Sequence, residues 1–122
     1  MKILVVEDEM SLQSIIKTKL LNCGFDVEAT NSVDGALKIV NQAAIDAIWL
    51  DHYLVGEKNG LDLVIDLKND EKYKSIPIFV VSNTASPDKL NSYIKFGVDK
   101  YYTKSNATLS EIVDDITKRI KQ

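Results

Sequence analysis

The stretch Ala47-Ile48-Trp49-Leu50-Asp51 decides the predicted fold, because an unbroken apolar run leads directly into one carboxylate. A short apolar run that is followed by a polar, Gly-containing segment is typical of a strand buried on both faces of a parallel sheet. Asp51 then lies at the carboxyl end of this strand, where ligands bind in open α/β sheets. The stretch therefore predicts both a parallel sheet and a functional carboxylate at its edge.

A second stretch repeats this plan at the N-terminus, where the apolar run Ile3-Leu4-Val5-Val6 ends in Glu7, Asp8 and Glu9. If the two strands are neighbours, Glu7, Asp8 and Asp51 meet at one edge of the sheet. Three carboxylates in one place repel each other unless a cation lies among them. A structural alternative stays open for Glu7 and Asp8, because acids are also favoured in the first turn of a helix.

Length and composition are those of one globular domain. The chain has 122 residues, of which 45% are hydrophobic and 27% are charged, and its net charge is -3, so we expect a single domain over residues 1–122. The lack of a basic face argues against nucleic-acid binding, and no apolar stretch approaches the roughly 20 residues of a membrane span. A single cysteine excludes an internal disulfide and, with no signal peptide before the first strand, favours the cytoplasm.

Strand and helix patterns alternate along the whole chain. Strands are predicted at residues 2–6, 25–29, 46–50, 77–81 and 98–103, with one helix after each. This alternation predicts a flavodoxin-like, doubly wound (βα)5 fold, an α/β architecture whose five-stranded parallel sheet has the order 2-1-3-4-5 and helices on both faces. Its switch point lies between the first and third strands, which end in Glu7 and Asp51. Ser82 follows the fourth strand and Lys104 follows the fifth, so both reach the same edge.

The helical spacing of apolar residues indicates which side chains fill the core. We expect Ile15 of the first helix to face inward, together with Leu90, Tyr93 and Ile94 of the fourth helix. Cys23 falls on the apolar stripe of the first helix and is interpreted as a small buried hydrophobe.

The residues at the strand ends resemble those of receiver domains in bacterial two-component response regulators, over the whole chain. The matching features are Val5-Val6-Glu7-Asp8, Trp49-Leu50-Asp51, Asn59-Gly60, Val80-Val81-Ser82, Gly97-Val98-Asp99-Lys100-Tyr101 and Lys104. Each is weak by itself, but all of them in order, each at a strand end, form a specific pattern. The resemblance implies a signalling domain rather than an enzyme, one that at most promotes its own phosphorylation and dephosphorylation.

The resemblance implies an Mg²⁺-dependent phosphoacceptor site. A carboxylate is a competent nucleophile toward phosphorus and gives an acyl phosphate, and Asp51 would be this acceptor. Mg²⁺ would neutralise the repulsion between the acidic cluster and the anionic phosphoryl group. Its protein ligands would be Asp8 and Asp51 directly, Glu7 through water, and the backbone carbonyl of Tyr53.

Three further residues belong to the implied switch. Lys104 would pair with one phosphoryl oxygen, the hydroxyl of Ser82 would turn to another, and Tyr101 would change rotamer in response. The face made by the fourth helix, the fifth strand and the fifth helix would then carry the signal to an unknown downstream protein. The phosphoryl group would come from a sensor histidine kinase or a phosphotransfer protein, and homodimerisation stays open.

Several of these side chains also have structural interpretations. Lys104 can be a solvated lysine and Ser82 a simple loop hydroxyl. Tyr101 and its neighbour Tyr102 can both be packing residues of the fifth strand, and which of them switches stays open. His52, in the loop after the third strand, is interpreted as a solvent-facing histidine rather than a catalytic one.

Three departures from the family pattern bear on the site. Ser105 stands where the family usually has a cis proline, so we expect a trans Lys104–Ser105 bond. We also expect Lys104 to reach Asp51 but to be poorly fixed until a phosphoryl group binds. Asn83 is bulkier than the usual alanine or glycine and can crowd the phosphodonor, and Glu57-Lys58 lengthens the loop after the acceptor.

Two other classes of protein remain as alternatives. A pseudo-receiver would use this fold as a protein-interaction module that is never phosphorylated; the missing proline and Asn83 favour it, whereas the intact acids, hydroxyl and lysine argue against it. A flavodoxin-like electron carrier would need a phosphate-binding loop after the first strand. Glu7-Asp8-Glu9 stands there instead, and its charge would repel a phosphate.

Overall fold

The computed structural model describes residues 1–83 and 86–121; residues 84 and 85, and residue 122 at the end of the predicted domain, lie outside the described residues. The elements of the described residues are, in order, β1 (Lys2–Val6), α1 (Met10–Asn22), β2 (Asp26–Thr30), α2 (Val33–Gln42), β3 (Ala47–Leu50), α3 (Gly60–Lys68), β4 (Ile78–Ser82), α4 (Pro87–Lys95), β5 (Lys100–Thr103) and α5 (Leu109–Ile120). The predicted alternation is confirmed; the limits of β1 are as predicted, and those of the other strands differ by one or two residues. None of these helices combines the length and apolarity that crossing a membrane requires.

The strands form one sheet in the order β2-β1-β3-β4-β5, and every neighbouring pair is parallel. This is the predicted order, with β2 at one edge. In the pairing of β1 with β3, Val6 lies opposite Leu50, and the backbone N–H of Asp51 donates to the carbonyl of Val6 at 2.9 Å. Glu7 and Asp51 therefore leave the sheet at the same level.

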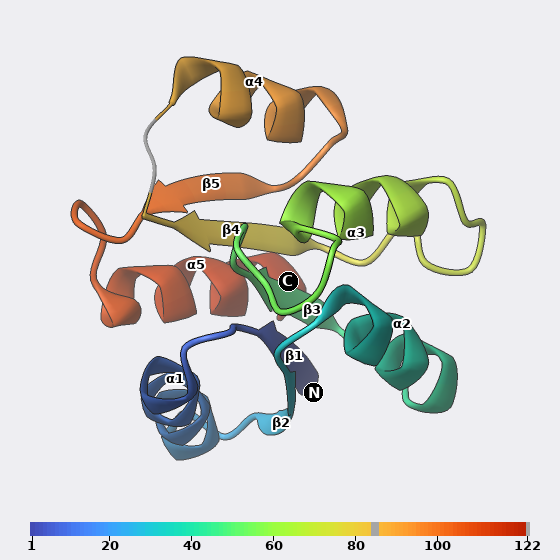
Figure 1. Ribbon diagram of the computed structural model, residues 1–122. Coiled ribbons are helices and arrows are strands. Elements are labelled where there is room, and N and C mark those ends of the chain that lie inside the picture. Colours follow the sequence, from blue (N-terminus) through green and yellow to red (C-terminus); the bar gives the residue numbers. More distant parts are fainter. Residues whose placement is uncertain (84–85, 122) are drawn as a thin grey trace.

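Helices cover both faces of the sheet, with α1 and α5 on one side and α2, α3 and α4 on the other (Figure 1). Alternate residues of β1 contribute to the two resulting cores. Leu4 and Val6 pack in the core that includes residues of α2 and α3, whereas Ile3 and Val5 pack with residues of α1 and α5. Trp49 of β3 belongs to this second core and is almost fully buried. Since both faces are covered, these strands need apolar residues at every position.

Helix α3 begins with a reciprocal capping box, which fixes the end of the loop that follows β3. The N–H of Asp62 donates to Asn59 Oδ1 at 3.1 Å, and the N–H of Asn59 donates to Asp62 Oδ2 at 2.9 Å. Two otherwise unpaired backbone donors are thereby satisfied. The next residue, Gly60, donates its N–H to the carbonyl of His52 at 2.8 Å. The loop after Asp51 is therefore closed by hydrogen bonds at the start of α3.

Four side chains that were expected in the core lie at the surface instead. Ile15 is exposed, because α1 turns the adjacent isoleucine toward the sheet. Leu90 and Ile94 are 37% and 51% exposed, because α4 turns only one of its residues, a tyrosine, into the core. Cys23 is exposed, because α1 ends one residue earlier and Cys23 belongs to the turn that follows. The expectation for Tyr93, which is buried, is confirmed.

Candidate functional site

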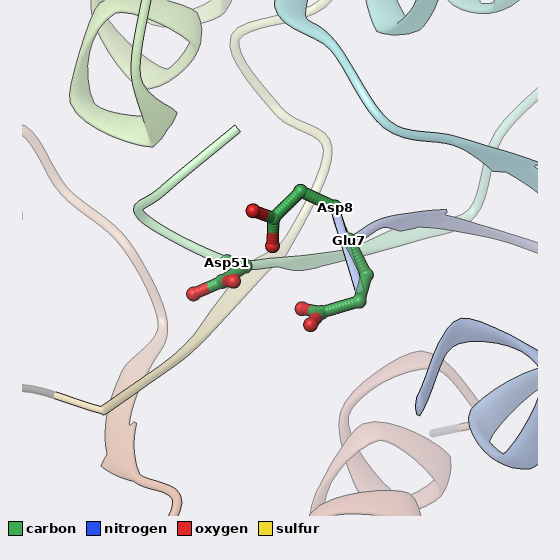
Figure 2. A group of neighbouring side chains, drawn as sticks. All are labelled: Glu7, Asp8 and Asp51. Atoms are coloured by element: carbon green, nitrogen blue, oxygen red, sulfur yellow. The ribbon is translucent and has the colours of Figure 1, made fainter. Parts of the chain in front are cut away.

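Three carboxylates lie together at the carboxyl edge of β1 and β3. Glu7 and Asp8 follow β1 and Asp51 follows β3, and one oxygen of each lies within 4.8 Å of the others. Figure 2 shows the three carboxylates directed toward the same space. Asp8 is exposed, whereas Glu7 and Asp51 are only 0% and 3% exposed. The strand order thus brings these acids together as the sequence predicts.

Lys104 joins this cluster from the segment that follows β5. Its Nζ lies 3.1 Å from Glu7 Oε1 and 3.4 Å from Asp51 Oδ2, and its side chain is 18% exposed. The expectation that Lys104 is poorly fixed without a phosphoryl group is therefore wrong, because the two carboxylates already hold the ammonium. Among the described residues no peptide bond is cis, so the Lys104–Ser105 bond is trans as predicted. The N–H of Lys104 also donates to the carbonyl of Ser82 at 2.8 Å.

The buried charges perturb each other. Burial, and then the charge of Asp51, raise the pKa of Glu7 to about 7, although Lys104 acts in the opposite direction. Burial also raises the pKa of Asp51, against the lowering effects of Lys104 and of the His52 N–H. Burial alone would lower the pKa of Lys104, but the charges of Asp51 and Glu7 outweigh it and raise this pKa. Burial therefore opposes ionisation of both carboxylates, and among the described residues Lys104 is the only cationic side chain paired with them.

The donor set fits a hard divalent cation such as Mg²⁺. It consists of carboxylate oxygens, which Mg²⁺ prefers. Glu7 Oε2 is buried and has no hydrogen-bond partner among the described residues, and a buried unpaired carboxylate oxygen is costly. A cation, or a water molecule bound to it, would relieve both the unpaired oxygen and the repulsion among Glu7, Asp8 and Asp51. Glu7, Asp8 and Asp51 could therefore hold the ion.

The remaining predicted site residues lie close to this edge. Ser82 ends β4 and is buried, and Tyr101 lies on the neighbouring strand β5, half-buried. Asn83, the next residue after Ser82, is exposed. Tyr53 follows Asp51 by two positions, and its hydroxyl accepts a hydrogen bond from Lys89 Nζ of α4 at 3.0 Å. The functional roles of Ser82, Tyr101 and the Tyr53 carbonyl stay predictions.

His52 corrects one interpretation of the sequence. It is 7% exposed rather than solvent-facing, and its Nδ1 lies 2.6 Å from the hydroxyl oxygen of Tyr93 on α4. Burial, together with the charge of Lys89, lowers the pKa of His52. No local pattern could have revealed this contact, because the partner is 41 positions away along the chain.

Gln13 is a second residue that the sequence interpretation missed. Its side-chain amide donates to the carbonyls of Glu7 and Thr30, in both cases at 3.1 Å. The residue is buried on the inward side of α1. Gln13 thereby ties the ends of β1 and β2 together beneath the acidic cluster. A polar residue among the inward positions of a helix was the available signal for this role.

The chain belongs to the response regulator receiver domain family, whose family model matches residues 3–117. Chemotaxis protein CheY1 of Helicobacter pylori is 32% identical over 106 residues, which cover 85% of this chain and 85% of that protein. Chemotaxis protein CheY-3 of Vibrio cholerae is 30% identical over 124 residues, which cover 98% of this chain and 94% of its relative.

Solved structures show the same architecture. The receiver domain of the Francisella response regulator 1452 superposes with a TM-score of 0.87 at 25% identity, covering 98% of this chain and 96% of that one. The phosphorylated cyanobacterial phytochrome response regulator RcpA superposes with a TM-score of 0.80 at 26% identity, covering 97% and 89%. The predicted fold class and the resemblance stated from the sequence are both confirmed. The chain is thus a receiver domain of the two-component signalling type.

Proposed function

We propose that this receiver accepts a phosphoryl group on Asp51 in an Mg²⁺-dependent reaction, and that residues 1–122 act as one domain. The observation that carries the proposal is the meeting of four groups at one sheet edge. Asp51 has the oxygens of Glu7 and Asp8 within 4.8 Å and the ammonium of Lys104 at 3.4 Å. The edge thus contains a nucleophile, ligands for a cation and a cationic side chain for an anionic group.

The reaction is a phosphoryl transfer from a phosphohistidine of a sensor histidine kinase or a phosphotransfer protein. A carboxylate oxygen of Asp51 forms a bond to phosphorus while the phosphorus–nitrogen bond breaks, and the donor imidazole keeps the electron pair and takes up a proton. Asp8, Asp51 and the carbonyl of Tyr53, with Glu7 through water, would hold Mg²⁺, and the ion would supply charge neutralisation at the phosphoryl oxygens. The chain at most promotes its own phosphorylation and dephosphorylation, so its role is signalling. RcpA, a structural relative, has been described in a phosphorylated form.

The side chains around Asp51 then bind the new phosphoryl group or move in response to it. Lys104 is already held at the edge by two carboxylates, so a short movement lets it pair with a phosphoryl oxygen. The hydroxyl of Ser82 binds another oxygen, and Tyr101 changes rotamer. The face of α4, β5 and α5 carries this change to a downstream protein, and the exposed apolar side chains of Leu90 and Ile94 on α4 suit such a contact.

Intact-mass analysis after incubation with acetyl phosphate and Mg²⁺ tests the proposal. The parent chain should gain the mass of one phosphoryl group, and Asp51→Asn should gain none while keeping its fold. Asp66→Asn, which makes the same chemical change at an exposed position of α3, is the matched control and should label like the parent. Equal labelling of Asp51→Asn would refute the acceptor assignment. A parent chain that is labelled neither by acetyl phosphate nor by phosphorylated kinases would favour the pseudo-receiver.

A further inference from the structure

Two hydrogen bonds join the predicted phosphoacceptor to helix α4. The backbone N–H of His52 donates to Asp51 Oδ1 at 2.8 Å. The imidazole Nδ1 of the same residue lies 2.6 Å from the hydroxyl oxygen of Tyr93. Both rings are buried, and the ring centroids lie 5.7 Å apart in an edge-to-face arrangement. A single residue thus contacts the Asp51 carboxylate through its backbone and α4 through its side chain.

Tyr93 is the residue that anchors α4 to the domain. Of the residues of α4, all of which the structure describes, Tyr93 is the only buried one. Its apolar neighbours Leu90 and Ile94 are more exposed, so they contribute less than Tyr93 to holding the helix. The hydroxyl of Tyr93 is shielded from water, where a hydrogen bond is stronger and an unpaired partner is more costly. The position of α4 is therefore tied to the position of His52.

Gly60 shows how closely these parts are fitted. A Cβ atom at Gly60 would lie 2.6 Å from the carbonyl oxygen of Asp51 and 2.7 Å from the hydroxyl oxygen of Tyr93. It would also approach the Cα of His52 to 3.1 Å. Real Cβ contacts are not this short, so only glycine allows the acceptor backbone, the histidine and the tyrosine to meet at the start of α3.

We propose that the His52–Tyr93 hydrogen bond is a positioning contact that holds α4 in its unphosphorylated arrangement and couples that arrangement to the state of Asp51. This inference rests on the proposed phosphorylation of Asp51. An acyl phosphate changes the charge and position of the carboxylate that accepts from the His52 N–H, and the loop adjusts with it. The ring of Tyr93 lies 5.5 Å from that of Tyr101, so the same contact reaches the residue predicted to switch.

Such coupling is reciprocal, so removing the contact must change how Asp51 binds a phosphoryl group. We expect this hydrogen bond to weaken when the loop adjusts to the acyl phosphate, so it stabilises the unphosphorylated state relative to the phosphorylated one. Tyr93→Phe deletes the hydroxyl and keeps the ring, and it should make the phosphoryl mimic beryllofluoride, with Mg²⁺, bind about fivefold more tightly. Tyr73→Phe is the matched control. It removes a tyrosine hydroxyl that bonds Asn41, away from the acidic cluster, and it should leave the affinity unchanged.

A double variant separates coupling from simple loss of stability. Tyr93→Phe or His52→Phe alone leaves one buried polar group unpaired, whereas His52→Phe with Tyr93→Phe removes both, which restores stability. If the contact couples α4 to Asp51, the double variant regains its melting temperature but keeps the altered affinity. Amide NMR shifts of residues 87–95 should then change less on beryllofluoride addition than in the parent.

The outcomes distinguish the two proposals. A parent chain that binds beryllofluoride with the same affinity as Tyr93→Phe overturns the coupling and leaves the proposed function intact. The coupling is also overturned if affinity returns with stability in the double variant, since the contact would then be structural only. A parent chain that binds no beryllofluoride and gains no phosphoryl mass overturns the proposed function, and the coupling with it.

Discussion

Replacing Glu7 by glutamine should stabilise the protein in the absence of a divalent cation, although the residue belongs to the candidate site. Glu7 is fully buried, and one of its oxygens has no hydrogen-bond partner among the described residues. Its charge also faces that of Asp51. Glutamine has nearly the same shape and no charge, so Glu7→Gln keeps the packing and removes the repulsion.

The size of the stability gain from Glu7→Gln, and its dependence on pH, follow from the raised pKa of Glu7. Burial and Asp51 raise the pKa of Glu7 from 4.5 to about 7. At a pH above both values, the ionised Glu7 therefore destabilises the folded state by about 3 kcal/mol relative to a protonated Glu7. Since the folded state holds its proton more tightly, the stability of the parent falls as the pH rises from 4.5 to 7. Below 4.5 both states are protonated and the effect vanishes. The gain from Glu7→Gln should therefore be about 3 kcal/mol at pH 8 and under about 1 kcal/mol at pH 5.

Urea unfolding in a chelating buffer, followed by the fluorescence of Trp49, measures this difference. Trp49 is the single tryptophan of the chain and is buried, so its emission should report on the folded core. Glu57→Gln, an identical change at an exposed loop position, should alter the free energy of unfolding by less than about 0.5 kcal/mol. A Glu7→Gln variant with no added stability at pH 8, or with the same gain at both pH values, would refute the argument from buried repulsion.

Two further predictions concern the metal and the core. Mg²⁺ should raise the melting temperature of the parent by mass action. At ten times its dissociation constant it should stabilise the folded state by about 1.4 kcal/mol. Asp8→Ala should abolish this rise, and an unchanged rise in the variant would exclude the site. Leu63→Ala, at a fully buried position in the core beside α3, should lower the free energy of unfolding by about 3 kcal/mol and keep the Mg²⁺ response. Leu21→Ala, at a half-exposed position of α1, should cost under about 1 kcal/mol, and an equal loss in both variants would contradict the assigned core.

The sequence by itself determined the strands, their order and the convergence of the acids. Residues such as Ile48 and Trp49 are apolar at consecutive positions because helices cover both faces of the sheet, and this pattern is local. Once strand–helix alternation is recognised, chain connectivity restricts the order of a parallel sheet. The ends of β1 and β3 then fall side by side, so the meeting of Glu7 with Asp51 follows from positions along the chain.

The tertiary structure decided which side chains are buried or paired, and which residues are their partners. The side chain of Lys104 was expected to be poorly fixed, but its ammonium donates a hydrogen bond to Glu7, a residue 97 positions away. His52 was expected in solvent, but α4 covers it and Tyr93 bonds to it. The inward positions of α4 were predicted from spacing, and Leu90 proved exposed because the helix meets the body of the domain through one residue.

The physical reason for this difference is that sequence periodicity depends on local backbone geometry, whereas these contacts join distant segments of the chain. Periodicity reports which residues share a face of an element, because that geometry is fixed by the local backbone. It does not report how closely another element approaches that face, which depends on the packing of the whole domain. The His52–Tyr93 contact requires α4 to lie close above the loop after β3, and that approach is permitted by the missing side chain of Gly60. The loop after β3, which ends at Gly60, and helix α4 are far apart in the sequence, and together they fix this contact, so only the folded chain reveals it.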